Sequence, residues 1–185
     1  MTDETRLTPQ QEEALREYVA QQAEAQRFIR SLTLPQLAAL SDRELFDAVR
    51  LRLIDEAHTA DEDTVIPLAR QVMHVIVAFY DEFRSGGLCL FFAGAGRVLA
   101  PDLADCLIEV GAEDHAELLT AFMNVHGVNP EDLESFACTS TAQLLETSQR
   151  LPFDDFDRTF EDLMKDQPLE PLCAAYIRKH FPEFA

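Results

Sequence analysis

The sequence predicts an all-α fold, a single compact domain of roughly eight to nine helices. Three observations lead to it. No segment alternates apolar and polar residues with the period of two that a half-buried strand needs. Proline, glycine and helix-capping residues divide the chain into pieces of helical length, and 47% of the 185 residues are apolar, enough to bury a core. We expect residues 1–60 to be an N-terminal helical portion and residues 61–185 to complete one continuous fold around a central buried helix.

The first predicted helix begins after Thr8, which can cap it, has Pro9 at its first position and runs to about Ser31. Mostly apolar residues recur along this helix every three or four positions and form one narrow stripe, as in a helix that packs against one neighbour. The stripe consists of Leu15, Tyr18, Gln22, Ala25, Ile29 and Leu32. It fits either packing on the rest of the domain or pairing with a second copy in a homodimer.

Pro35 then interrupts the chain, and Ser41 with Glu44 forms a capping box that opens a second helix. The apolar residues of that helix are Leu45, Phe46, Val49, Leu53 and Ile54. A charged turn at residues 61–64 separates it from Val65–Phe83, which is apolar nearly all round. The length of this run favours a central buried helix over the alternative, a β-strand, which its many β-branched residues would also fit.

The central helix leads into a glycine-rich stretch that predicts a buried hinge. We expect the helix to stop at Gly86-Gly87, to resume, and to stop again near Gly94, because glycine is well tolerated where a helix ends or bends. The predicted structural residues of the hinge are Gly86, Gly87, Phe91, Phe92 and Gly96. Prolines and glycines then delimit further helices at Pro101–Val110, Ala112–His126, after Asn129-Pro130, at Phe153–Gln167 and at Leu169–Phe181.

Charge is the strongest compositional feature of the chain. It carries 34 Asp and Glu against 15 Lys and Arg, a net charge of −19, which argues against direct binding to nucleic acid or to an anionic membrane. Residues 101–185 hold 18 of the acids and 5 of the bases, and no Lys or Arg lies between Arg97 and Arg150. Solubility, a salty cytoplasm or a basic partner would each account for this concentration of negative charge.

The acids beyond the hinge fall on the outer faces of the predicted helices, because apolar residues occupy the inner faces. Asp102, Asp105 and Glu109 extend over about 10 Å of helix, so they recur about every 5 Å. The phosphates of one DNA strand recur at a similar spacing, about 3.4 Å along the axis. The predicted partner-binding acidic face consists of Asp102, Asp105, Glu109, Glu113, Asp114, Glu117, Asp154, Asp155, Asp157, Glu161 and Asp162.

No catalytic motif or cofactor site is recognisable, so we expect a non-enzymatic protein without a cofactor or metal. Asp55 with His58 is half of a carboxylate metal site that has no second copy. Acids around His115 could meet a cation, but histidines in amphipathic helices are more often core-edge residues. The four cysteines form no CxxC pair and are expected to be reduced core thiols. A polar N-terminus and the lack of a long apolar run predict a cytoplasmic protein.

One stretch resembles a known family. The run Gly86-Gly87-Leu88-Cys89-Leu90-Phe91-Phe92, with Glu82 before it and Gly96 after it, is similar to the signature of the DNA mimic protein nineteen family. The resemblance extends over about residues 65–184 through Ile108 to Ala112, Phe156-Asp157 with Phe160, and Tyr176-Ile177 with Phe181. It implies an all-helical fold and, from the family's namesake activity, an acidic surface that occupies the DNA site of a DNA-binding protein.

The chain departs from that signature where the family has polar residues, with Ser85, Leu88, Leu90, Gly94 and Ala95 in their places. These changes favour a packing role for the hinge over a polar site. The leading hypothesis is an acidic interaction protein that binds a basic transcription or nucleoid protein. Two alternatives stay open: an immunity or scaffold protein that uses an apolar groove beside the hinge, and a metal-dependent hydrolase of unrecognised type.

Overall fold

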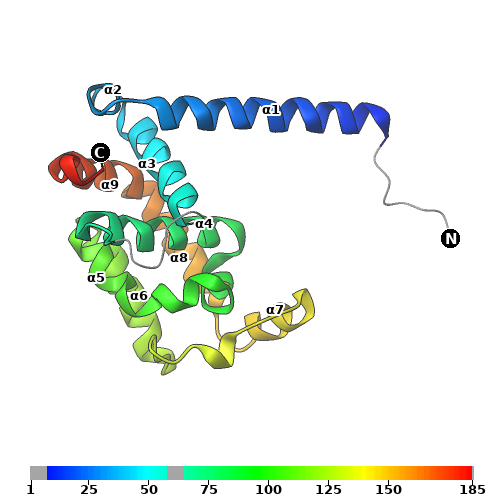
Figure 1. Ribbon diagram of the computed structural model, residues 1–185. Helices are drawn as coiled ribbons and strands as arrows, with labels where there is room; N and C mark the ends of the chain where they lie inside the picture. Colours follow the sequence, from blue (N-terminus) through cyan, green and yellow to red (C-terminus); the bar gives the residue numbers. More distant parts are fainter. Residues whose placement is uncertain (1–7, 58–64, 185) are drawn as a thin grey trace.

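The computed structural model describes residues 8–57 and 65–184, except for a few side chains of the first helix. These residues form nine α-helices and three short 3-10 helices, joined by turns and loops (Figure 1). The α-helices are α1 (Pro9–Ser31), α2 (Leu34–Ala38), α3 (Asp42–Ala57), α4 (Leu68–Ala93), α5 (Ala100–Glu109), α6 (Glu113–His126), α7 (Thr141–Ser148), α8 (Phe153–Asp166) and α9 (Leu169–Lys179). The 3-10 helices are η1 (Ala95–Leu99), η2 (Glu134–Phe136) and η3 (Phe181–Phe184). The all-α prediction is confirmed, and the strand alternative for the central apolar run is wrong.

Capping residues explain several of these boundaries. The Thr8 hydroxyl accepts a hydrogen bond from the Gln11 N–H at 3.3 Å, and the Ser41 hydroxyl accepts one from the Glu44 N–H at 3.4 Å. The Gln11 and Glu44 side chains accept in return from the cap backbone, which completes a capping box at the start of both α1 and α3. Gly127 ends α6 in the left-handed conformation, with φ of 64°. These boundaries lie where the sequence places them.

Two boundaries differ from the prediction. The helical path breaks just before Pro35, between Ser31 and Leu34, but Pro35 itself lies in the first turn of a short extra helix, α2, where its missing N–H would have no intrahelical partner. Asn129-Pro130 does not begin a helix, because the Asn129 side-chain oxygen accepts from the Glu131 N–H at 3.1 Å and closes a turn. The next α-helix is α7, which Ser140 caps.

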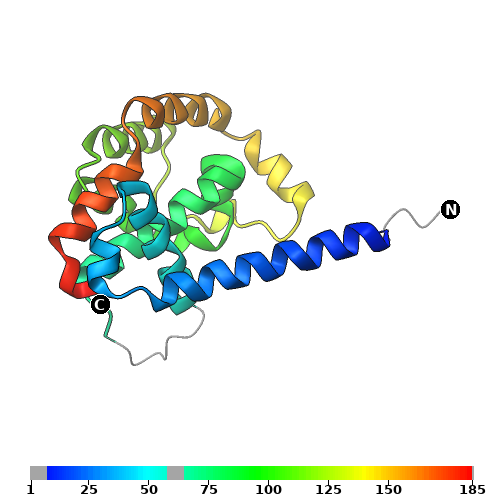
Figure 2. The same cartoon turned by 90° about the horizontal axis from the view of Figure 1, so that it is seen from above.

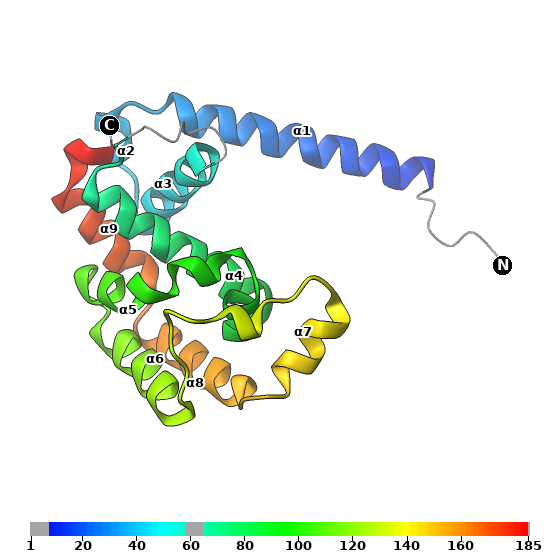
Figure 3. The same cartoon turned by 60° about the horizontal axis from the view of Figure 1, so that its bottom comes forward.

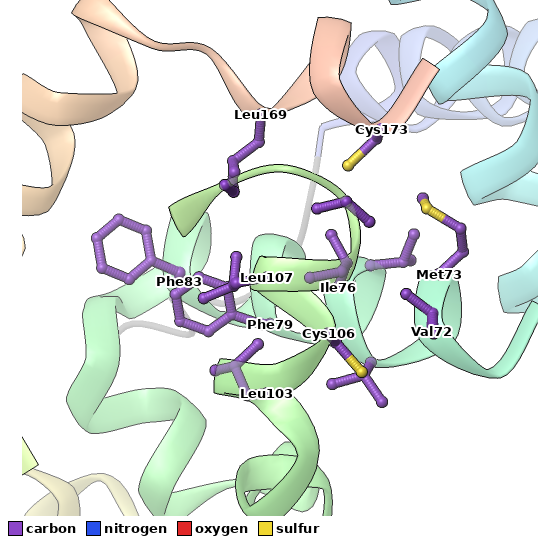
Figure 4. Close-up of a cluster of buried hydrophobic side chains, with 14 of the residues drawn as sticks. Val72, Met73, Ile76, Phe79, Phe83, Leu103, Cys106, Leu107, Leu169 and Cys173 are labelled. Atoms are coloured by element: carbon purple, nitrogen blue, oxygen red, sulfur yellow. The ribbon is translucent and has the colours of Figure 1, made fainter. Parts of the chain in front are cut away.

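α4 is the central helix, as predicted. α3, α5, α7 and α8 all pack against it, and α9 packs against α3. Figure 4 shows side chains from α4, α5 and α9 meeting in one buried cluster. In the same core, the Phe79 ring of α4 lies edge-on to Phe91 and Phe160, at centroid distances of 5.2 and 5.4 Å. The aromatic core therefore joins both halves of α4 to α8.

α1 is arranged differently from the other helices. Its C-terminal end packs on α3, where the Arg52 guanidinium donates hydrogen bonds to the carbonyl oxygens of Ile29, at 3.0 Å, and of Leu32. Its N-terminal end extends away from the other helices as an arm (Figures 1 and 3). The view from above shows the same projection (Figure 2). The domain thus consists of a packed body and one long projecting helix.

Four further expectations concern particular segments or residues. The predicted turn at residues 61–64 and the predicted division after residue 60 lie outside the described residues. Within those residues no single helix is long and apolar enough to cross a membrane, although α4 and Ala95–Glu109 reach that composition together across a bend of 71°. The four cysteines are free thiols, three of them buried and Cys138 half-buried.

Candidate functional site

The predicted break in the central helix lies at Gly86 and Gly87, inside α4. Gly87 has φ of 72°, in the left-handed region that residues with a side chain rarely adopt, and Gly86 is also non-helical. The helix direction changes here, so the segment after the bend packs back on the segment before it. The break is confirmed, and it is buried at Gly87 but exposed at Gly86.

Asp157 of α8 holds this bend. Its Oδ1 accepts a hydrogen bond from the Leu88 N–H at 2.9 Å, and a Cβ atom at residue 87 would lie 1.9 Å from its Oδ2. Burial raises the pKa of Asp157, and the hydrogen bond from Leu88 opposes that shift. Asp157 was expected on the outer acidic face, but it is half-buried with its carboxylate on the bend. Asp157 is therefore not part of the exposed acidic surface.

A second carboxylate lies at the far end of the short helical segment that follows the bend. Glu82 Oε1 accepts a hydrogen bond from the Gly96 N–H at 3.1 Å, and a Cβ atom at residue 96 would lie 2.6 Å from Glu82 Oε2. Burial raises the pKa of Glu82, and the Gly96 hydrogen bond opposes the shift. The sequence signature thus contains two contacts between a carboxylate and a backbone amide: Asp157 with Leu88, directly after the double glycine, and Glu82 with the late glycine, Gly96. Both contacts fix the packing of the bend.

Three of the predicted acids gather on α5. Asp102, Asp105 and Glu109 are exposed along one side of this helix and border a groove of about 310 Å³ between α5 and the first half of α4. The groove is lined by Leu68, Gln71, Val72, Val75, Asp102, Asp105, Cys106 and Glu109. We call it the α5 groove. Sequence reasoning predicted its acidic rim but not its apolar floor, because α4 contributes most of the floor from a distant part of the chain.

The three acids act together on the electrostatics of the α5 groove. Burial raises the pKa of the Cys106 thiol to about 11, to which the negative charges of Asp102, Asp105 and Glu109 also contribute. Within the described part of the chain, none of the three carboxylates forms an ion pair with a basic side chain. Their charge is therefore available to a partner.

The acids of α6 divide between two environments. Glu113 and Glu117 line a depression of about 400 Å³ along α6, together with Ile108 of α5. Asp114 accepts a hydrogen bond from the Gln167 side-chain amide at 2.6 Å, which ties the start of α6 to the end of α8. Glu113 and Glu117 therefore extend the acidic surface beyond α5, while Asp114 also has a structural contact.

The acids of α8 are partly offset by bases on the same helix. Its exposed members of the predicted face are Asp154, Asp155, Glu161 and Asp162. Arg158 lies 3.3 Å from Asp155, and Lys165 lies 2.7 Å from Asp162, both at exposed i, i+3 positions. Exposed pairs of this kind contribute little to stability but reduce the local negative charge. The charge on α5 is less compensated than that on α8.

His115 was expected at the edge of the core, but its side chain is fully buried. Its ring lies edge-on to Phe160 at a centroid distance of 5.2 Å, and neither ring nitrogen has a hydrogen-bond partner among the described residues. Burial lowers the pKa of His115. The His115 ring lies inside the core, whereas Glu113 and Glu117 line a depression on the outside, so they do not face the ring. Among the described residues, no group of three or more His, Cys, Asp or Glu could hold a metal ion. His58, of the other half-motif, lies outside the described residues.

An apolar groove also lies beside the bend, between α4 and α7. It measures about 250 Å³ and is lined by Gly86, Cys89, Thr141, Leu144, Leu145 and Ser148. Leu145 is 62% exposed, whereas Leu88 and Phe92, which the sequence pointed to, are completely buried. Leu88 and Phe92 thus belong to the core and not to the groove.

These features define a class of acidic, all-α proteins. Their central helix bends at a pair of glycines, and a carboxylate from another helix accepts a hydrogen bond from the backbone at the bend. The family model described as DMP19-like protein matches residues 64–180, more than half of the chain, so the chain belongs to this family. Neither the curated proteins nor the solved structures contain a match. The matched range includes the bend, α5 and α8 but not α1, α2 or α3.

Proposed function

We propose that the chain is a non-enzymatic interaction protein whose α5 groove binds the DNA-binding surface of a basic protein. The observation that carries the proposal is the row of Asp102, Asp105 and Glu109, unpaired in the described residues, on a rigid helix beside an apolar floor. Membership of a family named for a DNA mimic supports it. A transcription or nucleoid protein is the kind of partner that this chemistry would recognise.

The groove has two properties that a basic surface needs. Lysine and arginine side chains have apolar stems and charged ends, so the stem can lie on Val72 and Val75 while the charged end reaches a carboxylate. The carboxylates recur about every 5 Å along the helix, close to the spacing of DNA phosphates. Glu113 and Glu117 would lengthen the row, since α6 packs beside α5.

The proposal is tested by capturing partners from a lysate at about 50 mM and about 500 mM salt, because screening weakens exposed electrostatic contacts. The captured protein is then challenged with duplex DNA. We expect a DNA-binding protein that is bound at low salt, lost at high salt and displaced by the duplex.

Two triple variants separate the groove from net charge. Reversing the groove acids, by Asp102→Lys, Asp105→Lys and Glu109→Lys, should abolish capture. The control variant carries Glu131→Lys, Asp132→Lys and Glu146→Lys, an equal change in charge at exposed acids away from α5, and should still capture the partner. Equal capture by both variants, or no DNA-binding protein at low salt, would refute the proposal.

A second candidate function uses the apolar groove beside the bend. Exposed Leu145 and half-buried Leu144 favour an immunity or scaffold protein that binds an apolar segment there. Such binding would tolerate salt, because burial of apolar surface drives it. Leu145→Glu should abolish it without affecting capture through the α5 groove. Changes at buried Leu88 or Phe92 would test stability instead.

A further inference from the structure

The projecting part of α1 carries apolar side chains that the body does not cover. Leu15 is 50% exposed, Tyr18 59% and Phe28 63%. The stripe that contains Leu15 and Tyr18 continues at its other end into Ile29 and Leu32, which pack on the core. A helix gains most of its stability from packing of its apolar face. The exposed half of this stripe therefore calls for a partner in line with an established interface.

The sequence of α1 indicates what kind of partner fits. Counted in heptads with Leu15 at position a, the stripe residues Tyr18, Ile29 and Leu32 fall on positions d, a and d. Of the charged residues in Pro9–Ser31, all except Glu12 fall on the outer positions b, c and f; these are Glu13, Arg16, Glu17, Glu24, Arg27 and Arg30. The face beside the stripe is thus nearly free of charge. It suits an equally uncharged helix and not a basic surface.

We propose that α1 pairs with α1 of a second copy of this chain, antiparallel, to form a homodimer. The helix holds four acids and three bases, so two copies meet there with little repulsion, although each chain carries a net charge of −19. An antiparallel arrangement places the two bodies at opposite ends of a helix about 34 Å long. This separation is several times the Debye length of about 8 Å at physiological salt. A parallel pair would bring the two acidic bodies together.

Pairing of a positions with d positions allows antiparallel registers one heptad apart, and the proposed register is the one with the longest overlap that stops short of the bodies. Leu15 of each copy then packs on Tyr18 of the other, and Gln11 lies opposite Gln22. In this register Thr8 reaches the level of Ala25, just before Ile29, where α1 begins to pack on its own body. In this register the projecting part of each α1 is paired along its length, and its N-terminal end stops short of the body of the other copy.

The test is the molar mass of the full chain measured by sedimentation equilibrium over a range of concentrations. Wild type should dimerise, and Leu15→Glu with Tyr18→Glu should weaken the dimer by at least about 100-fold, since both copies lose both contacts. The control variant carries Val98→Glu and Val125→Glu, which add the same charge at residues 71% and 77% exposed on the body, and should dimerise like wild type. Thermal unfolding of each variant checks that the body still folds.

Orientation and salt provide two further readouts. Gln11→Cys should not form a disulfide between copies, because the two Gln11 positions lie about 17 Å apart along an antiparallel pair but side by side in a parallel one. Raising salt should strengthen the dimer, because screening reduces repulsion between the bodies. A monomer at every concentration, a dimer retained by the α1 variant, or rapid Gln11→Cys cross-linking would overturn the proposal.

Discussion

The carboxylate of Asp157 reaches the Leu88 amide because residue 87 has no side chain. A Cβ atom there would lie 1.9 Å from the carboxylate, and the backbone has φ of 72°. Replacement of Gly87 therefore meets two separate penalties, conformational strain and displacement of the hydrogen-bond acceptor. Gly111 has φ of 83°, but among the described residues no atom beyond its own and its neighbours' in the chain lies within 4 Å of its Cβ position, so it isolates the first penalty.

We expect Gly87→Ala to lower the free energy of unfolding by about 2 to 4 kcal/mol and Gly111→Ala by only about 1 kcal/mol. Urea denaturation of both variants measures the difference. Equal losses would mean that the contact between Asp157 and the bend contributes nothing.

The raised pKa of Asp157 predicts a dependence of stability on pH. Burial favours the protonated form of Asp157 in the folded protein. The contribution of this carboxyl to the free energy of unfolding is therefore largest below its ordinary pKa of 3.8, and it is lost as pH rises through the raised pKa. Asp157→Asn keeps an oxygen that can accept from Leu88 and does not ionise. Its unfolding free energy relative to wild type should therefore rise with pH above about 4 and then level off. The exposed Asp132→Asn serves as the control, and a profile no different from that of the control would contradict the assignment.

At the scale of elements, the interface between α6 and α8 contains one buried imidazole. His115 packs on Phe160 with both nitrogens unpartnered among the described residues, and burial lowers its pKa. The fold favours the neutral form of His115. The contribution of His115 to the free energy of unfolding is therefore largest above its ordinary pKa of 6.5 and is lost as pH falls through the lowered pKa. This dependence on pH is opposite in sign to that of Asp157.

His115→Leu should remove this loss of folding stability at low pH, because leucine does not ionise. The measurement is the unfolding free energy of His115→Leu and wild type between about pH 5 and pH 8. We expect the variant to gain on wild type as pH falls below about 6.5. The exposed His126→Leu is the control, since His126 lies on the outside of the same helix. A constant difference across this range would show that His115 is not held neutral by the fold.

The helical elements could be predicted from local signals, and the candidate surface only in part. The capping boxes at Thr8 and Ser41 and the glycine break at Gly87 are encoded within a few residues, so they appear where expected. The inward turn of Asp157 depends on a backbone amide 69 residues away, which periodicity does not reveal. The floor of the α5 groove likewise requires the packing of two helices.

At the scale of the whole molecule, the net charge of −19 opposes folding through self-repulsion. Raising NaCl from about 50 to about 500 mM should therefore increase the melting temperature by a few degrees. The control variant at residues 131, 132 and 146, with a net charge of −13, should respond less. Equal responses of the two proteins would show that the charge is too dispersed to affect stability.

In the proposed function, the α5 groove and duplex DNA compete for one surface of a basic protein. The most direct measurement is a titration in which the chain displaces a fluorescent duplex from the captured partner, followed by anisotropy. Wild type and the control variant at residues 131, 132 and 146 should release the duplex, and the variant reversed at Asp102, Asp105 and Glu109 should not. A duplex that stays bound at saturating wild-type protein, or that the reversed variant also releases, would refute the proposed function.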